Sequence, residues 1–222
     1  DWDGDGIDTI GVFDTGGTFY LRNSNSGGAP DITPFAFGAG SWTPVAGDWD
    51  GDGIDTIGVF DTAGNWYFRN SHSGGAPDIT PFAYGGAGWK PVVGDWDGDG
   101  IDTIGVFDPL GKWHLRNSNS PGAADITAFA YGLGSWTPVA GDWDGDGIDT
   151  IGVFDPLGFW HLRNSNSPGA ADITAFDYGG GNWTPVVGDW NGPSVPEPAT
   201  ASLALLGLIG MAGLGMRRRR AA

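Results

Sequence analysis

Cysteine is absent from the 222-residue sequence, and basic residues are scarce. Without cysteine, no disulfide framework can form. The first 192 residues carry 26 Asp against six Lys or Arg, which leaves a net charge of −20. A body this acidic repels a phosphate backbone, which argues against nucleic-acid binding, and it attracts divalent cations. No helical hydrophobic period occurs before residue 199 either, which argues against a helical fold.

One nine-residue stretch, DWDGDGIDT, dominates what is present. It occupies residues 1–9 and returns unchanged at 48–56, 95–103 and 142–150, so that successive copies begin 47 residues apart. A fifth copy begins at Asp189 and breaks off as Asp-Trp-Asn-Gly-Pro. A long regular period with 12 Trp and 12 Phe indicates a repeat architecture rather than a low-complexity chain. The predicted organisation is a repeat domain over 1–192, with units 1–47, 48–94, 95–141 and 142–188, followed by a separate segment at 193–222.

Each unit predicts four short strands, separated by clusters of Gly, Pro and Asp. In the first unit these strands are expected at 8–14, 18–23, 32–37 and 42–47. Between the first two strands, the third unit reads Asp108-Pro109-Leu110-Gly111, which fits a type I turn. Four strands in roughly 40–50 residues are typical of a propeller blade. The predicted fold class is therefore all-β: a β-propeller of repeated four-stranded blades, followed by one C-terminal transmembrane helix.

The tryptophans fall at three positions of the unit. The loop set is Trp2, Trp49, Trp96, Trp143 and Trp190; the set that opens the fourth strand is Trp42, Trp89, Trp136 and Trp183; the second-strand set is Trp66, Trp113 and Trp160. A large aromatic at the same place in every unit suits blade-to-blade packing, because each blade has an apolar face that it cannot bury alone.

The spacing of the acidic stretch is that of a calcium loop. Asp1, Asp3 and Asp5 stand on alternate residues, and Gly6 then supplies a sharp turn. The alternative is a solvated Asp/Gly turn. Against that alternative, four carboxylates within eight residues repel one another by about 1 kcal/mol per pair in water, a cost that a bound cation offsets. Position 12, which is Glu in an EF-hand, is Val12 here, which argues against that motif.

We predict Ca²⁺ as the cofactor, held by positions 1, 3, 5, 7, 8 and 9 of each loop, with position 7 acting through its backbone carbonyl. The predicted ligands are Asp1, Asp3, Asp5, Ile7, Asp8 and Thr9; Asp48, Asp50, Asp52, Ile54, Asp55 and Thr56; Asp95, Asp97, Asp99, Ile101, Asp102 and Thr103; and Asp142, Asp144, Asp146, Ile148, Asp149 and Thr150. Either the Asp at position 8 or the Thr at position 9 closes the site, and the sequence leaves both open.

The stretch DWDGDGIDTIGVF resembles the calcium loop and following strand of FG-GAP-type repeats in integrin-like β-propellers and their bacterial relatives. The family pattern is Asp-x-Asp-x-Asp-Gly-x-x-Asp. Positions 1, 3, 5 and 6 match it in all four copies, whereas the last Asp of the pattern is replaced by Thr at position 9, with Asp one residue earlier. The resemblance covers residues 1–192.

The same resemblance implies that residues 42–47 form the inner strand of a blade, followed by the loop and first strand of the next unit. The chain then begins within a blade. Residues 183–189 are a spare inner strand at the other end, which either closes a small ring against the first unit or belongs to a further blade.

Residues 193–222 are a different kind of segment. Residues 199–216 carry no charge and are rich in Leu, Ala and Gly. As a helix they span roughly 27 Å, enough to cross a bilayer. The four arginines that follow then stay on the cytoplasmic side. The alternative is a buried core helix, but nothing in the repeat body needs an apolar helix of 18 residues.

The tail resembles the PEP-CTERM sorting signal, with a Pro-Glu-Pro motif, an apolar span and a terminal Arg run. The predicted signal residues are Pro196, Glu197, Pro198, Arg217, Arg218, Arg219 and Arg220. The resemblance implies export in a Gram-negative bacterium, transient anchoring in the inner membrane, recognition by an exosortase, and release to the cell surface or an extracellular matrix. Because the sequence begins on an acidic loop without a signal peptide, we expect it to be a fragment.

No residue constellation predicts an enzyme. His72, His114 and His161 are scattered, and one Arg per unit, such as Arg22, is interpreted as pairing with a nearby Asp. We therefore expect an exported, non-enzymatic, calcium-stabilised repeat protein for surface display, cell adhesion or exopolysaccharide-matrix association. The alternatives are a carbohydrate-binding module, which needs an exposed Trp set, and an accessory domain of an upstream enzyme. Expected partners are the exosortase, exopolysaccharide or other surface proteins, and the membrane before cleavage.

Overall fold

The computed structural model describes residues 1–190, which belong to one compact unit spanning Asp1–Gly192. These residues form fifteen strands and no helix. Accordingly, the described part of the chain has no helix long and apolar enough to cross a membrane. The transmembrane helix predicted at 199–216 and the sorting residues lie outside the described residues.

The strands form four antiparallel sheets in which neighbours along the chain pair with one another. The first sheet is β1 (Gly11–Phe13), β2 (Thr18–Leu21) and β3 (Phe35–Ala36). The second is β4 (Thr43–Gly47), β5 (Thr56–Phe60), β6 (Asn65–Phe68) and β7 (Ile79–Ala83). The third is β8 (Lys90–Gly94), β9 (Thr103–Phe107), β10 (Lys112–Leu115) and β11 (Ile126–Ala130), and the fourth is β12 (Thr137–Gly141), β13 (Thr150–Phe154), β14 (Phe159–Leu162) and β15 (Phe176–Asp177).

Every four-stranded sheet takes its strands from two consecutive sequence units. β4 closes the first unit and pairs with β5 of the second, with Gly47 opposite Thr56 across the acidic loop. This confirms that residues 42–47 provide the first strand of a blade rather than the last. The first sheet begins at β1, and no described strand pairs with the free side of β1.

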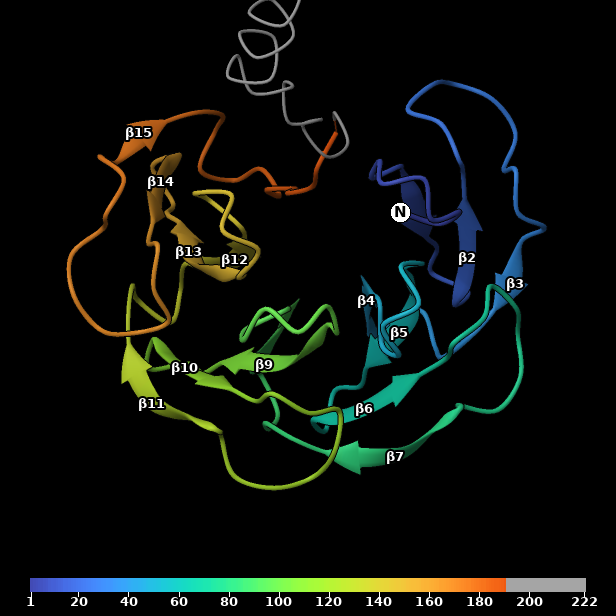
Figure 1. The fold of residues 1–222 in the computed structure, drawn as a ribbon, viewed down its shortest axis with the longest axis horizontal. Coiled ribbons are helices and arrows are strands. Elements are labelled where there is room, and N and C mark those ends of the chain that lie inside the picture. Colours follow the sequence, from blue (N-terminus) through green and yellow to red (C-terminus); the bar gives the residue numbers. More distant parts are fainter. Residues whose placement is uncertain (191–222) are drawn as a thin grey trace, which may run out of the picture. The chain divides into compact units, whose positions relative to one another are not determined.

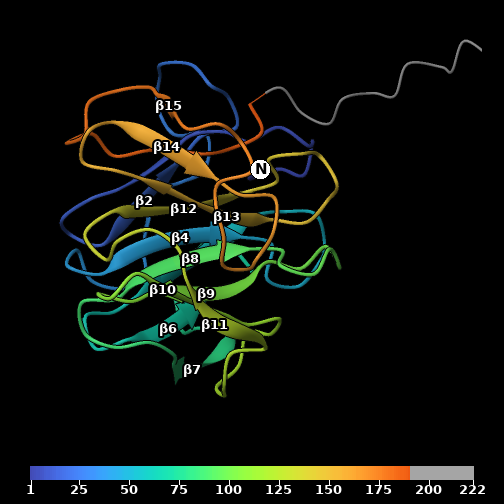
Figure 2. The same ribbon diagram turned by 90° about the vertical axis from the view of Figure 1, so that its left-hand side faces the viewer.

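The four sheets are arranged as the blades of a propeller (Figure 1). We call them the first to fourth blades in chain order. The leading strands of the second to fourth blades, β4, β8 and β12, lie together in the middle of the unit, where β8 contacts both β4 and β12 (Figure 2). The all-β propeller predicted from the repeat period is thereby confirmed.

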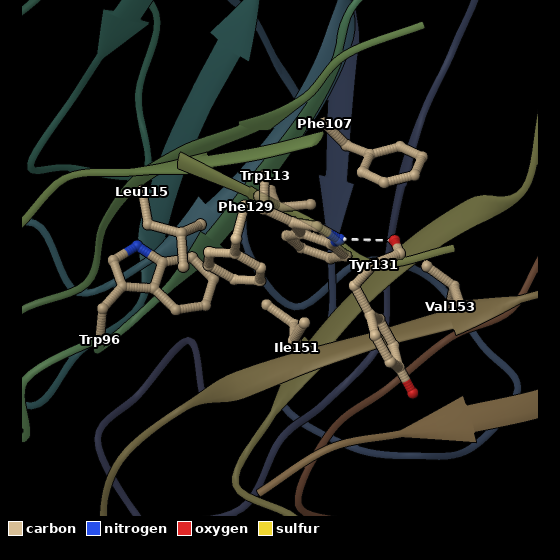
Figure 3. Close-up of a cluster of buried hydrophobic side chains, with 9 residues drawn as sticks. Trp96, Phe107, Trp113, Leu115, Phe129, Tyr131, Ile151 and Val153 are labelled. Atoms are coloured by element: carbon tan, nitrogen blue, oxygen red, sulfur yellow. Dashed lines mark hydrogen bonds between the residues drawn. The ribbon is translucent and has the colours of Figure 1, made fainter. Parts of the chain in front are cut away.

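The apolar core lies between consecutive blades. In the third blade, Trp113, Phe107 and Leu115 pack with other rings against Ile151 and Val153 of the fourth blade (Figure 3). Corresponding clusters join the first blade to the second and the second to the third. The second strand of each four-stranded blade, Thr-Ile-Gly-Val-Phe, is buried along its whole length.

The turn after this strand forms as its sequence predicts. The carbonyl of Asp108 accepts the Gly111 N–H at 3.0 Å. Its side-chain Oδ1 accepts the N–H groups of Leu110 and Lys112 at 2.8 and 2.9 Å. Gly111 has a φ of 83°, a conformation that side chains disfavour. The Asp and the Gly are therefore both required by the turn itself.

Candidate metal centre

The carboxylate at position 1 folds each acidic loop around itself. In the second unit, Asp48 Oδ1 accepts the N–H groups of Gly51 and Asp52 at 2.7 and 3.2 Å, and Oδ2 accepts that of Gly53 at 2.7 Å. Gly51 and Gly53 have φ values of 76° and 83°, which explains the glycine at both places. In the fourth loop, burial raises the pKa of Asp142, but hydrogen bonds from the loop N–H groups outweigh it and hold that pKa below its usual value. In this fourth loop, position 1 therefore acts as a carboxylate.

Positions 1, 3 and 5 converge in all four loops. Each of these residues offers one oxygen atom, and the three atoms of a loop lie within 4.8 Å of one another. Oxygens bound to Ca²⁺ at 2.3–2.6 Å can be up to about 5 Å apart on opposite sides of the ion, so all three fit one cation. The groups are Asp1, Asp3 and Asp5; Asp48, Asp50 and Asp52; Asp95, Asp97 and Asp99; and Asp142, Asp144 and Asp146. Their chemistry, three hard carboxylates open to solvent, suits a calcium-type ion.

Asparagines from the strand ends orient two of these carboxylates. Asn70 Nδ2 donates to Asp50 Oδ2 at 2.7 Å, and Asn117 Nδ2 donates to Asp97 Oδ2 at the same distance. These asparagines are not among the residues predicted from the sequence. The available signal was the Asn that recurs 22 residues after each loop begins.

The isoleucine at position 7 connects the loops of neighbouring blades. A Cβ added to Gly4 would lie 3.1 Å from Ile54 Cγ1, and one added to Gly51 would lie 3.1 Å from Ile101 Cγ1. The side chain at position 7 therefore packs onto the loop of the preceding unit, and glycine at position 4 makes room for it. The backbone N–H at position 7 is bound within its own loop, as Ile54 donates to Asp52 Oδ1 at 3.0 Å.

The aspartate at position 8 forms a clamp between blades. Asp102 donates its N–H to the Asp48 carbonyl at 2.8 Å, and its Oδ2 accepts the Asp48 N–H at 2.9 Å. Burial raises the pKa of Asp102 to about 7 and that of Asp149, which makes the same clamp with Asp95, to about 6. The position-8 side chains line a cavity of about 720 Å³ together with Asp1 and Asp142, and none of them belongs to the carboxylate groups that converge at positions 1, 3 and 5.

The threonine at position 9 closes the hairpin that carries the loop. Thr103 Oγ1 donates to the Gly94 carbonyl at 3.3 Å, and Thr56 and Thr150 make the corresponding bonds. The structure thus groups positions 1, 3 and 5 and engages positions 8 and 9 in contacts between strands and blades.

Two further residue types support the loop from the segment after the second strand of each unit. Asn119 Nδ2 donates to the Asp102 carbonyl at 2.8 Å, and Asn25 and Asn166 do the same in their units. Arg116 lies 4.0 Å from Asp125 and donates to Ser118 and Ser120. The predicted structural pairing of the repeated Arg with a nearby Asp is therefore present, and it shapes this segment.

His114, His161 and the tryptophans of the second and third blades serve blade packing. His114 stacks on Trp89 with ring centroids 4.9 Å apart, and its Nε2 lies 3.2 Å from Asp108 Oδ2. His161 repeats both contacts. Trp66 and Trp113 have no exposed surface, and the loop residues Trp49 and Trp96 are buried. These rings contribute to the cores rather than to an open platform.

Comparison with known proteins identifies the tail but not the repeats. The family model of the PEP-CTERM protein-sorting motif matches residues 194–220. No curated protein matches the chain. No solved structure matches it. The sorting motif implies an exported protein that is membrane-anchored before an exosortase processes it, which confirms this part of the sequence interpretation.

Proposed function

We propose that the repeat domain is a non-enzymatic propeller of the FG-GAP type that Ca²⁺ stabilises outside the cell, where it serves surface display, adhesion or matrix association. The observation that carries the proposal is the convergence of three carboxylate oxygens within 4.8 Å, repeated in four loops. Without a cation, each group places like charges at a distance where they repel one another. One Ca²⁺ per loop removes that repulsion.

Export supports calcium as the ion. The sorting motif implies that the mature domain works outside the cytoplasm. Extracellular calcium modules have dissociation constants of about 10⁻⁴–10⁻³ M. A solvent-exposed loop with three carboxylates and no bidentate Glu suits that weak class, because it holds its ion without a buried cage.

A melting experiment with the full chain tests the proposal. At a free Ca²⁺ concentration ten times the dissociation constant, each site adds about 1.4 kcal/mol of stability, so that four sites give a large rise in Tm. We expect excess EDTA to reverse the rise and Mg²⁺ to reproduce little of it, because Mg²⁺ demands a tighter octahedral geometry. Equal melting temperatures in 10 mM Ca²⁺ and in EDTA would overturn the proposal.

A matched pair of variants assigns the effect to the loops. Asp52→Asn removes one carboxylate from the second loop, whereas Asp177→Asn removes the same charge from an exposed position on β15. We expect the first variant to lose about a quarter of the calcium-dependent stabilisation and the second to keep all of it. Equal losses would mean that Ca²⁺ only screens the net charge.

A carbohydrate-binding role finds less support, because the tryptophans of the second and third blades are packed in cores or against neighbouring rings. Surface display requires no sugar site. Adhesion is tested by binding of the calcium-loaded chain to purified exopolysaccharide and to whole cells, with the EDTA-treated chain as the control.

A further inference from the structure

The two ends of the ring show an interface with no partner in the described residues. Each of the three inter-blade cores receives an Ile and a Val from the following blade, such as Ile57 and Val59. In the first blade the same two positions face outward. Val12 is 65% exposed, whereas Val59, Val106 and Val153 are fully buried, and Ile10 differs from its counterparts in the same way.

The other end of the ring shows the complementary half of this interface. Tyr178, at the outer end of the fourth blade, is 76% exposed, whereas its counterparts Tyr84 and Tyr131 are 8% exposed. Phe176 and Trp183 are exposed beside it. We call β1 with Ile10 the leading flank and residues 176–190 the trailing flank. Outside turn tips, nearly all large exposed apolar side chains of the described chain lie on these two flanks.

The clamp between position 1 of one blade and position 8 of the next shows which place residues 183–189 occupy. Asp189 accepts the Asp8 N–H at 3.0 Å and donates its own N–H to Asp8 Oδ2 at 2.5 Å. Asp48 makes the same two bonds with Asp102, which belongs to the following blade. Residues 183–189 therefore occupy the place of the leading strand of a blade of their own, between the fourth blade and the first. They bond to the first unit as one blade bonds to the next, and they do not provide the leading strand of the first blade.

Two further observations define what fits between the flanks. In the second to fourth blades, a Trp before the leading strand stacks on a Tyr or His of the third strand, as Trp42 does on Tyr67. Within the described residues, Trp183 and Tyr20 occupy these two positions without a stacked ring. Beside β1, an apolar cavity of about 200 Å³ is lined by Gly11–Phe13 and by Pro44–Ala46 of β4, where the leading strand of the first blade would pass.

We propose that the two flanks are the docking site for one further 47-residue repeat of this same kind. Its first three strands would complete a blade with residues 183–188, in which Asp189 already holds position 1 of the loop, and its last strand would lie in the cavity beside β1. Such a unit would insert an Ile and a Val into the core beneath Tyr178, stack a Tyr or His on Trp183, and stack a Trp on Tyr20. The interface is continuous with the three existing ones, so its partner needs the same chemistry.

The position of the Asp1 nitrogen determines the register in which a repeat fused before Asp1 would enter. The Asp1 nitrogen lies 2.5 Å from Asp55 Oδ2, as the peptide nitrogen of Asp48 lies 2.9 Å from Asp102 Oδ2. A repeat joined at Asp1 by a peptide bond therefore enters in register.

The test uses the full chain with a copy of residues 142–188 fused directly before Asp1. The matched control carries the same copy with its counterparts of Ile151 and Val153 both replaced by Asp.

Amide hydrogen exchange of the three full-length chains in mild detergent, with sedimentation velocity, gives the readout. We expect the intact fusion to slow exchange at Gly11–Phe13 and at 183–188 at least tenfold relative to the natural chain, as a monomer, and the control to give no protection. Equal exchange in the two fusions would overturn the proposal. So would strong protection in a monomeric natural chain, which would show that the ring closes on itself, or in a dimeric one, which would show that a second copy occupies the flanks.

Discussion

Val106→Ala measures how much stability one inter-blade core provides. Val106 is fully buried in a cluster with Phe60, Trp66 and Tyr84 of the preceding blade. Removing its two methyl groups loses about 1.6 kcal/mol of transfer free energy, at about 0.8 kcal/mol for each group. The surrounding rings are held by their own strands and collapse little, so a cavity term adds to the loss. We expect a total destabilisation of about 2–3 kcal/mol.

Val12→Ala is the control at the same position of the repeat. Because Val12 lies on the exposed side of β1, its truncation should cost less than about 0.5 kcal/mol. Urea unfolding of the full chain, followed by Trp fluorescence and circular dichroism, gives both free energies. In thermal melts the Val106 variant should lose roughly 4–12 °C, at about 2–4 °C for each kcal/mol in a domain of this size.

Two results would refute this reasoning. A loss below about 0.5 kcal/mol at Val106 would mean that the inter-blade cluster is not the stabilising core. Equal losses at Val106 and Val12 would mean that β1 is covered in solution, and the exposed leading flank would then be wrong. The comparison is direct because both substitutions remove the same atoms from the same strand position.

Three other predictions follow from named contacts. Trp113→Phe removes a fully buried indole hydrogen bond and should cost about 2–3 kcal/mol in urea unfolding, whereas Trp160→Phe, where the same bond is exposed, should cost less than about 1 kcal/mol. Burial raises the pKa of Asp108, but hydrogen bonds from Lys112, His114 and Leu110 outweigh it, so the pKa of Asp108 in the folded chain is lowered. The stability that Asp108 contributes is therefore present above the unfolded pKa near 4 and is lost as pH falls through the folded pKa. Calorimetry of Asp108→Asn should show a smaller drop in Tm below pH 4 than calorimetry of the natural chain. Asn117→Ala frees the position-3 carboxylate of its loop and should weaken the calcium binding that we propose there about tenfold in titration calorimetry, with Asn164→Ala, whose side chain makes no such bond, as the control.

The repeat period made the fold predictable. A 47-residue unit with four alternating or apolar segments specifies short strands and turns, and the Asp and Gly of each turn act within four residues of one another. The blade boundary was implied by the resemblance to FG-GAP-type repeats, and the pairing of β4 with β5 across the acidic loop confirms it. Such features can be predicted because the residues that interact are close together in the sequence.

The contacts between blades were not predictable from the sequence alone. Asp102 and Asp48 are 54 residues apart, and nothing in the stretch DWDGDGIDT shows that its eighth residue bonds to the previous copy rather than to an ion. The Asn that orients position 3 acts across 20 residues, from the end of a strand whose register had to be known first. Identical copies hide this information, because a contact within a unit and one between units have the same sequence signature.

The loop residues therefore carry different kinds of evidence about calcium. Position 1 is required to fold its own loop, since its oxygens accept several backbone N–H groups. Position 8 is required to join two blades. Both would recur unchanged in a propeller that binds no ion. At positions 3 and 5 the folding role is one hydrogen bond each, such as Asn70 to Asp50 or Ile54 to Asp52, so a neutral Asn would satisfy the fold nearly as well. The persistence of a charged Asp at these two positions in all four loops is what favours a cation, and substitutions there are the ones that separate calcium binding from folding.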